Sequence, residues 1–302
     1  MPTDEIAVLV NPLAGSGRRR DLVPRVLRRL GAAGPVRVLD AADSAAAERA
    51  CHAAVERGAR AVVAVGGDGT VHRALQAVAG RPVGFGVVPA GTGNDFASGA
   101  GMPGDPLTCA ARIAAALRED RRHPLDLALI EAGGPQRSAS PRWFGAVLAA
   151  GFDAQVNERA NRLRRPRGPR RYDLAIALEL ARLRPRRYAL EVDGADCSFD
   201  GVLAAVGNCP SYGGGMRVVP DADPADGLLD VVVAASLGRA ALVAMKPRLR
   251  RGTHVHDPRV TTYRARQVRL HAEGVVGYAD GERIGPLPMT VRCVAGALRL
   301  LR

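Results

Sequence analysis

The sequence predicts an α/β domain with a doubly wound parallel sheet over residues 1–122, followed by a β-rich antiparallel sandwich domain over residues 123–302. In the first range, apolar runs of strand length alternate with helical patterns. In the second range, short strands are separated by glycine and Asp-Gly turns. Glycine-rich corners follow three of the first-domain strands, and parallel strands bring such corners to one edge of the sheet. This division allows the last residues of the chain to pack on the first domain.

The elements of the first domain follow from hydrophobic periodicity. Its strands lack alternation, as expected where helices cover both faces of a sheet. The expected strands are Ile6–Val10, Val36–Leu39, Ala61–Val65 and Val83–Val88. The expected helices follow Gly17, span Ala45–Arg57, run from Val71 to near Gly80, and span Asp105–Arg118.

The second domain opens with a strand-like segment over Leu125–Ile130. Its other expected strands are Trp143–Ala149, Tyr188–Val192, Val202–Val206, Leu228–Val233, Val268–His271, Met289–Val294 and Ala297–Leu301. Between them, Asn161–Arg187 holds ten arginines and includes a helical pattern over Tyr172–Leu183. This segment has two interpretations: a solvated basic helix that covers the sheet, or a contact with the anionic surface of a membrane.

Composition limits the class of protein. With 302 residues and 47% hydrophobic content the chain is long enough for two well-packed cores. Neither a spanning segment nor a signal pattern is evident, so we expect a cytoplasmic protein that associates peripherally with the inner face of the membrane. Five scattered cysteines without a CxxC pair argue against a disulfide framework. His254 and His256 are interpreted as surface or loop residues.

The net charge of +13 predicts attraction to anionic partners but does not define the chemistry. Lys246 is the only lysine, and a bias toward arginine codons accounts for part of the excess. Aromatic residues make up 4% of the chain and no aromatic-basic strand of the RNA-binding type is present. We therefore expect no nucleic-acid partner.

The corner at residues 66–70 reads Gly-Gly-Asp-Gly-Thr and lies between a buried strand and a helix. Its glycines allow backbone N–H groups to approach an anion, and the helix adds its positive N-terminal end. Asp68 supplies the one carboxylate of the loop. The pattern suits a nucleotide phosphate with its Mg²⁺, although any strand-to-helix corner also favours small residues.

Taken together, the three corners resemble a known family. NPLAGSG at residues 11–17, GGDGTV at 66–71 and PAGTGNDFA at 89–97 occur in this order, each after an expected strand. Gly151-Phe152-Asp153, the acidic run at 220–230 and Asp280-Gly281-Glu282 follow. The set resembles the diacylglycerol kinase catalytic-domain family, which includes bacterial lipid kinases and sphingosine kinases, and the resemblance extends from about residue 5 to the C-terminus.

The resemblance implies a two-domain kinase that binds ATP and Mg²⁺ in a cleft and transfers the γ-phosphoryl group to the hydroxyl of diacylglycerol or a related lipid alcohol. It implies that Asp280 and Glu282 activate that hydroxyl and that Asp68 acts near Mg²⁺. A second, structural Mg²⁺ would bind Asp223, Asp226 and the backbone of Leu228. The residues implied to contact the nucleotide are Asn11, Gly15, Ser16, Gly17, Gly66, Gly67, Asp68, Gly69, Thr70, Thr92, Asn94 and Asp95. Phosphoryl transfer needs mainly positioning and charge stabilisation, for which these residue types suffice.

Some residues depart from the family pattern and keep alternatives open. His72-Arg73 stands where many bacterial members carry Asn-Glu, and Ser98 stands where arginine is common. Asp280-Gly281 is also a common hairpin signal, and the acidic run at 221–230 is also compatible with a turn. The alternatives are a kinase of the NAD kinase type with a soluble substrate, and a basic membrane-surface protein with impaired catalysis. The particular lipid and a homodimeric state stay open.

Overall fold

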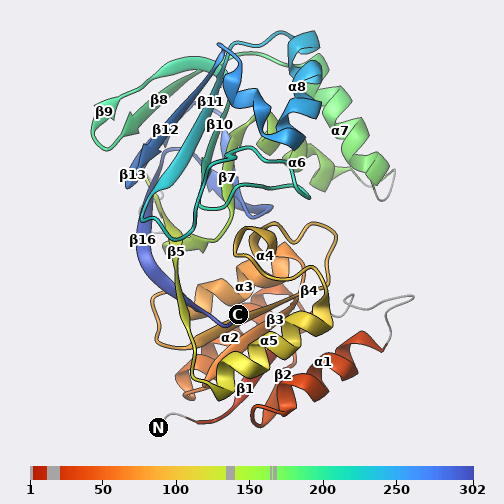
Figure 1. The fold of residues 1–302 in the computed structure, drawn as a ribbon. Helices are drawn as coiled ribbons and strands as arrows, with labels where there is room; N and C mark the ends of the chain where they lie inside the picture. The colour runs from red at the N-terminus through yellow and green to blue at the C-terminus, as the bar shows by residue number, and fades with distance from the viewer. Residues whose placement is uncertain (1–2, 12–20, 134–139, 164, 166–168) are drawn as a thin grey trace. The chain divides into compact units, whose positions relative to one another are not determined.

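The computed structural model describes residues 3–11, 21–133, 140–163, 165 and 169–302. The chain forms two compact units (Figure 1). Unit 1 comprises Met1–Leu127, Pro224–Gly227 and Val294–Arg302, and unit 2 comprises Ala128–Asp223 and Leu228–Cys293. Two strands, β5 (His123–Ala132) and β16 (Met289–Leu300), run from one unit into the other.

Unit 1 is built on a parallel sheet. Its strands are β1 (Ile6–Val10), β2 (Val36–Leu39), β3 (Ala61–Gly66) and β4 (Gly84–Pro89), in the order β4-β3-β1-β2. All residues of β3 and β4 are buried. The end of β16 adds a further parallel strand beside β4, where Leu300 is paired with Phe85. The predicted parallel sheet is therefore confirmed, with a C-terminal strand added to it.

Helices cover both faces of this sheet (Figure 1). The helix α1 (Leu22–Gly31) packs with α5 (Pro106–Arg118), and α2 (Ser44–Glu56) packs with α3 (Asp68–Val78). The N-cap residues Asp43 and Asp105 each accept a hydrogen bond from the backbone N–H three residues on, which fixes where α2 and α5 begin. A short helix, α4 (Asp95–Gly99), follows β4.

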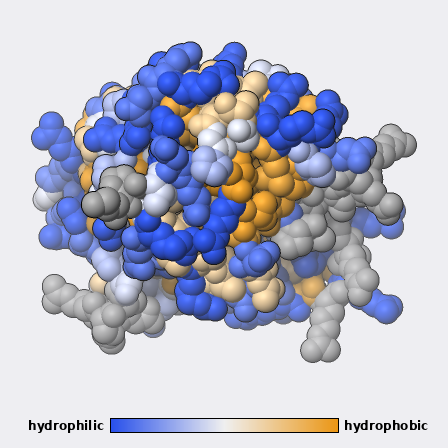
Figure 2. Space-filling view, turned by 90° about the horizontal axis from the view of Figure 1, so that it is seen from below, coloured by the Kyte–Doolittle hydropathy of each residue, from blue (hydrophilic) through white to orange (hydrophobic). Residues whose placement is uncertain are grey.

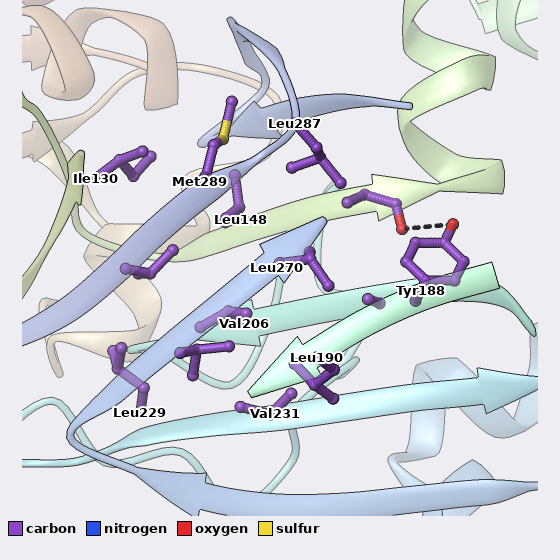
Figure 3. Packing of buried hydrophobic residues seen from close by; sticks show 14 of the residues in the cluster. Ile130, Leu148, Tyr188, Leu190, Val206, Leu229, Val231, Leu270, Leu287 and Met289 are labelled. Atoms are coloured by element: carbon purple, nitrogen blue, oxygen red, sulfur yellow. Dashed lines mark hydrogen bonds between the residues drawn. The ribbon is translucent and has the colours of Figure 1, made fainter. Parts of the chain in front are cut away.

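Unit 2 is an antiparallel sandwich, as predicted. One sheet joins β15 (Glu282–Pro286), β14 (Val276–Ala279), β7 (Val147–Gly151), β10 (Phe199–Gly207), β11 (Leu229–Ala235) and β12 (Val260–Ala265) in that order. The other contains β9 (Ala195–Asp196), β8 (Arg186–Val192), β13 (Gln267–His271), β16, β5 and β6 (Arg142–Phe144). Both sheets contribute buried side chains to one hydrophobic core (Figure 3). The ring of Tyr188 stacks on Phe199 with centroids 4.9 Å apart.

The described part of unit 2 also contains the α-helices α6 (Phe152–Arg162), α7 (Pro169–Ala181) and α8 (Arg239–Arg251). The helix α6 lies against β7, β10 and β14, and α7 packs on α6. A small apolar cluster of Val156, Ala160 and Ala175 joins these two helices apart from the main core. The space-filling view shows hydrophilic residues over most of the visible surface, with hydrophobic residues gathered mainly near its centre (Figure 2).

Several second-domain elements differ from the prediction. The strand expected at Trp143–Ala149 is divided into β6 and β7, whereas the two expected C-terminal strands form the single strand β16. The sequence reasoning missed α6, α8, β12, β14 and β15. His254, in the short helix η3 (Thr253–His256), is buried rather than at the surface, because its Nε2 is hydrogen-bonded to the Val218 carbonyl at 2.9 Å.

Candidate functional site

The corner between β3 and α3 is packed so tightly that only glycine fits at its first position. Gly66 ends β3, Gly67 is the N-cap of α3, and Asp68 is the first helical residue. A Cβ on Gly66 would lie 2.3 Å from the Thr70 Oγ1. The Gly67 carbonyl accepts hydrogen bonds from the N–H groups of residues 70 and 71, which starts the helix. The Asp68 carboxylate is thereby held at the helix N-terminus, at the carboxyl edge of the parallel sheet.

A second predicted corner touches the first. A Cβ on Gly91 would lie 2.4 Å from the Gly67 Cα, so the two backbones are in direct contact. Asn94 adopts the left-handed conformation, with φ 58°, and stabilises the second loop. Its Oδ1 accepts from the Gly91 N–H at 3.1 Å and its Nδ2 donates to the Gly91 carbonyl at 3.0 Å. The Phe96 N–H donates to the Asp68 Oδ1 at 3.4 Å, which adds a link between the loops.

The remaining residues predicted to contact a nucleotide lie around this pair of loops. Asn11 follows β1, and its N–H donates to the Val65 carbonyl at 3.0 Å, so the ends of β1 and β3 are adjacent. Thr92 is exposed and Asp95 is buried at the start of α4. Gly69 and Thr70 lie in the first turn of α3. Gly15, Ser16 and Gly17 lie outside the described residues.

We expect Gly91→Ala to weaken nucleotide binding by at least about tenfold, because its methyl group would push the two loops apart at their backbone contact. The measurement is titration of the purified variant with Mg-ATP by calorimetry. Gly31→Ala in unit 1 is a matched control, since nothing lies within 4 Å of a Cβ built there. Equal affinity in Gly91→Ala and the wild type would contradict the prediction.

In unit 2, the structure gives different environments to the two acids of the Asp280-Gly281-Glu282 hairpin. Asp280 adopts φ 51°, and its Oδ2 and Oδ1 accept from the backbone N–H groups of Gly145 (3.0 Å) and Ala146 (2.8 Å). These two residues lie between β6 and β7, so Asp280 also explains why the expected strand is divided there. Glu282 begins β15 and is partly exposed. Both residues are partly buried, and the two backbone hydrogen bonds are what distinguishes the Asp280 carboxylate.

Glu158 on α6, which the sequence reasoning missed, anchors the same hairpin. Its Oε2 accepts from the Tyr278 hydroxyl at 2.7 Å and from the Arg283 Nε at 3.1 Å. Its Oε1 accepts from the Arg162 Nη2 at 2.6 Å. The Tyr278 hydrogen bond is the main cause that holds the pKa of Glu158 below its ordinary value. The helix therefore fixes the residues on both sides of Asp280 and Glu282.

Asp153 occupies the first turn of α6 and is partly covered, but its Oδ2 is buried and makes no hydrogen bond among the described residues. The Oδ1 accepts from the Ala154 N–H at 2.8 Å. Burial raises the pKa of the Asp153 carboxyl to about 6, against the opposing effect of hydrogen bonds from Ala154 and the Tyr212 hydroxyl. The group therefore changes its charge in a pH range in which ordinary aspartates are fully ionised.

This shift predicts a pH-dependent gain in stability for Asp153→Asn. The folded-state pKa of about 6 exceeds the ordinary value of 3.8, so the favourable protonated form is fully available below pH 3.8 and is lost as the pH rises through 6. The neutral asparagine escapes that loss, which amounts to about 3 kcal/mol for a shift of this size. We expect urea unfolding to show the variant gaining on the wild type between about pH 4 and pH 6, with a constant difference above about pH 7. A difference independent of pH would contradict the assignment.

Asp126 was also missed, and it organises the acidic turn of unit 1. It is 4% exposed within β5. Its Oδ2 accepts from the Gly227 N–H and its Oδ1 from the Gly296 N–H, both at 2.7 Å. Its own N–H donates to the Pro224 carbonyl at 2.7 Å. The sequence signal for this role is a single aspartate within the otherwise apolar run Leu125–Ile130.

The residues that the family resemblance implies as a second metal site lie within or directly beside the segment Pro224–Gly227. Asp223 and Asp226 are exposed and Leu228 is partly buried. Two carboxylates and a backbone carbonyl on a short segment form an all-oxygen donor set, which fits the ligand preference of Mg²⁺. Within the described part of the chain, no three His, Cys, Asp or Glu side chains are grouped as a metal centre. A cation bound here would therefore draw further ligands from backbone carbonyls and water, as Mg²⁺ commonly does.

The residues that depart from the family pattern lie on α3 and α4. His72 is 1% exposed, and its carbonyl accepts from the Gln76 Nε2 at 3.0 Å. Arg73 is partly buried and Ser98 is exposed. His72 therefore belongs to the packed interior of unit 1 and Ser98 to its surface.

Comparison with known proteins identifies relatives over nearly the whole chain. Residues 5–130 match the diacylglycerol kinase catalytic domain, and residues 146–302 match the YegS C-terminal NAD kinase beta sandwich-like domain. A diacylglycerol kinase of Mycobacterium tuberculosis is 39% identical over 300 residues, covering 99% of this chain and 95% of that protein. A protein of Stenotrophomonas maltophilia named as a YegS-like lipid kinase is 30% identical over 267 residues, covering 84% of this chain and 82% of its own length.

Solved structures show the same fold. A diacylglycerol kinase structure from Bacillus anthracis superposes with a TM-score of 0.71 at 19% identity, covering 99% of this chain and 96% of that one. An Archaeoglobus fulgidus NAD kinase in complex with ATP superposes with a TM-score of 0.57 at 14% identity, covering 99% and 93%. In the described residues, the helices are too short or too polar to span a bilayer.

Proposed function

Because the chain belongs to the diacylglycerol kinase catalytic-domain family and is a kinase, we propose that it transfers the γ-phosphoryl group of ATP to the hydroxyl of diacylglycerol or a related lipid alcohol. The observation that carries the proposal is the direct contact of two glycine loops, with Asp68 at the helix N-terminus beside them. Unit 1 would bind the nucleotide and unit 2 the lipid, corresponding to domains at 1–122 and 123–302.

In this proposal the residues of unit 1 bind and orient the nucleotide. Backbone N–H groups at the N-terminus of α3, from Gly67 to Gly69, face the phosphates, and Asn94 holds the second loop in place. Asn11, Thr92, Asp95 and the segment Gly15–Gly17 complete the nucleotide side. Asp68 would hold Mg²⁺, which when bound would neutralise charge that develops on the transferred group. Asp223, Asp226 and the Leu228 carbonyl would hold a structural Mg²⁺.

The acceptor hydroxyl is oriented by unit 2. Glu282 accepts the hydroxyl proton, since its carboxylate is partly exposed. Asp280 shapes the hairpin through its two backbone hydrogen bonds and thereby positions Glu282. The protein encounters its lipid substrate at an anionic membrane surface, to which its net charge of +13 attracts it.

The test is incorporation of ³²P from γ-labelled ATP into a total lipid extract, resolved by head group, with NAD offered in parallel. We expect Mg²⁺-dependent label in a phosphatidic-acid-type product and none in NADP. NAD kinase structures share this fold, so label in NADP alone would favour a soluble acceptor and overturn the proposal. Absence of label in both products would support the catalytically impaired alternative.

A further inference from the structure

The outer layer of unit 2 has an unusual combination of exposed apolar and basic residues. Large exposed hydrophobic side chains in the described part of the chain are Val38, Tyr172, Leu174 and Val243. All of these except Val38 lie on α7 and α8. The Arg239 side chain at the start of α8 donates to the Ala181 carbonyl at the end of α7 at 2.7 Å, which joins the two helices. Figure 1 shows them on the same side of unit 2.

The helix α7 carries apolar residues on its outer side as well as on its inner side. Its inner side packs Ala175 against α6, where Glu179 also forms an ion pair with Arg159. Its outer side carries Leu174, Ala177 and Ala181, spaced three and four residues apart and all exposed. A surface helix normally places polar residues on its outer side. An apolar outer stripe therefore indicates that a nonpolar environment covers α7 when the protein acts.

Basic residues surround these apolar positions. The exposed ones on the two helices and just beyond α7 are Arg170, Arg182, Arg184, Arg239, Lys246, Arg250 and Arg251, whereas Asp173 is the exposed acid. Arginine and lysine extend their charged ends from an apolar surface to anionic head groups while their alkyl stems stay in the nonpolar layer. The outer side of α8 adds Val243, which is 56% exposed.

We propose that α7 and α8 form a membrane-docking face that binds an anionic phospholipid surface, with Leu174 and Val243 entering the interfacial layer and the surrounding arginines contacting lipid phosphates. This inference rests on the proposed function, since a lipid acceptor is available only at a membrane. Charge complementarity selects this occupant over a second copy of the chain. A symmetric dimer through this face would bring the same arginine-rich patches together, and such contacts repel.

The first experiment measures partitioning of the full chain onto sedimented vesicles of phosphatidylcholine with or without phosphatidylglycerol. We expect binding to the anionic vesicles that weakens with salt. The double variant Leu174→Asp/Val243→Asp should lower that binding at least about tenfold, because two carboxylates would enter the interface. Val38→Asp is the matched control: Val38 is 41% exposed in unit 1 and should change binding less than twofold.

A second pair of variants tests the charges. Arg170→Gln/Arg250→Gln should lower binding to anionic vesicles about 25-fold, since each basic residue near such a surface contributes roughly fivefold. Arg112→Gln/Arg118→Gln on α5, which removes two exposed arginines of unit 1, should leave most of the binding intact. Equal losses in the two pairs would show that only net charge matters and would overturn the proposal.

The remaining outcomes separate this face from the kinase activity. With a short-chain, water-soluble diacylglycerol and Mg-ATP, Leu174→Asp/Val243→Asp should retain wild-type turnover, while turnover on vesicles falls with binding. A wild type that phosphorylates no lipid but binds anionic vesicles through this face would refute the kinase proposal alone. Unchanged vesicle binding in the double variant would overturn the docking face. If the wild type is a dimer and the double variant is a monomer, the face belongs to an interface with a second copy instead.

Discussion

Replacing Asp68 by asparagine is expected to lower kcat for phosphoryl transfer about a thousandfold while the protein stays folded. Its carboxylate is the only one in the Gly66–Thr70 corner. In the proposed function this carboxylate holds the Mg²⁺ that accompanies ATP, and loss of such electrostatic stabilisation typically costs this much. Asparagine keeps an oxygen that is able to accept the hydrogen bond from the Phe96 N–H, whose nitrogen lies 3.4 Å from the Asp68 Oδ1 in the wild type. The loops should therefore remain in contact, and the loss should reflect the missing charge.

Steady-state kinetics with Mg-ATP measures the loss of kcat, and thermal unfolding shows whether the variant stays folded. Asp43→Ala is a suitable control because Asp43 also begins a helix of unit 1 and its side chain accepts the Ala46 N–H at 2.7 Å. Its loss should reduce stability by about 1 kcal/mol and leave turnover unchanged. An Asp68→Asn enzyme with wild-type turnover would remove Asp68 from the site and with it the central assignment in unit 1.

The sequence was most informative where structure is local. The strands Ile6–Val10 and Val36–Leu39 have the predicted bounds. Both belong to the parallel sheet. The predicted gathering of glycine corners at one edge of the sheet also follows from local rules, because adjacent parallel strands place successive corners there. Gly67 and Gly91 meet there although the chain between them forms a helix and a strand.

Residues whose hydrogen-bond partners are distant in the sequence could not be predicted from local patterns. Asp126 binds N–H groups 101 and 170 positions further along the chain, and no local pattern reveals those partners. Glu158 similarly contacts Tyr278 and Arg283, 120 and 125 positions away. The helix α8 was missed for a different reason: it contains Pro247, and an internal proline normally argues against a helix.

The same distinction applies to the two acids of the 280–282 hairpin, which the sequence does not separate. Sequence shows only that both carboxylates lie near an Asp-Gly turn. The structure shows that the Asp280 carboxylate accepts two backbone N–H groups from the connection between β6 and β7, and that Asp280 adopts a left-handed conformation. A carboxylate used in this way positions the hairpin, and in the proposed function it is Glu282 that acts on the substrate hydroxyl.

Substitution of each acid by its amide should therefore give opposite results. Glu282→Gln is expected to lower kcat by about 10² to 10⁴, the usual contribution of a general base, with little change in the free energy of unfolding. Asp280→Asn should instead destabilise the protein by about 1 to 3 kcal/mol, because an amide has one acceptor oxygen for two N–H donors and places its own NH₂ against the other.

Parallel measurement of turnover and urea unfolding distinguishes these roles, with the exposed Glu273→Gln in unit 2 as a control for loss of a surface carboxylate. The pH profile of kcat provides a further criterion. If Glu282 accepts the hydroxyl proton, its acidic limb should disappear in Glu282→Gln and persist in Asp280→Asn. Loss of turnover in Asp280→Asn at a temperature where it is fully folded, with normal turnover in Glu282→Gln, would transfer the base role to Asp280.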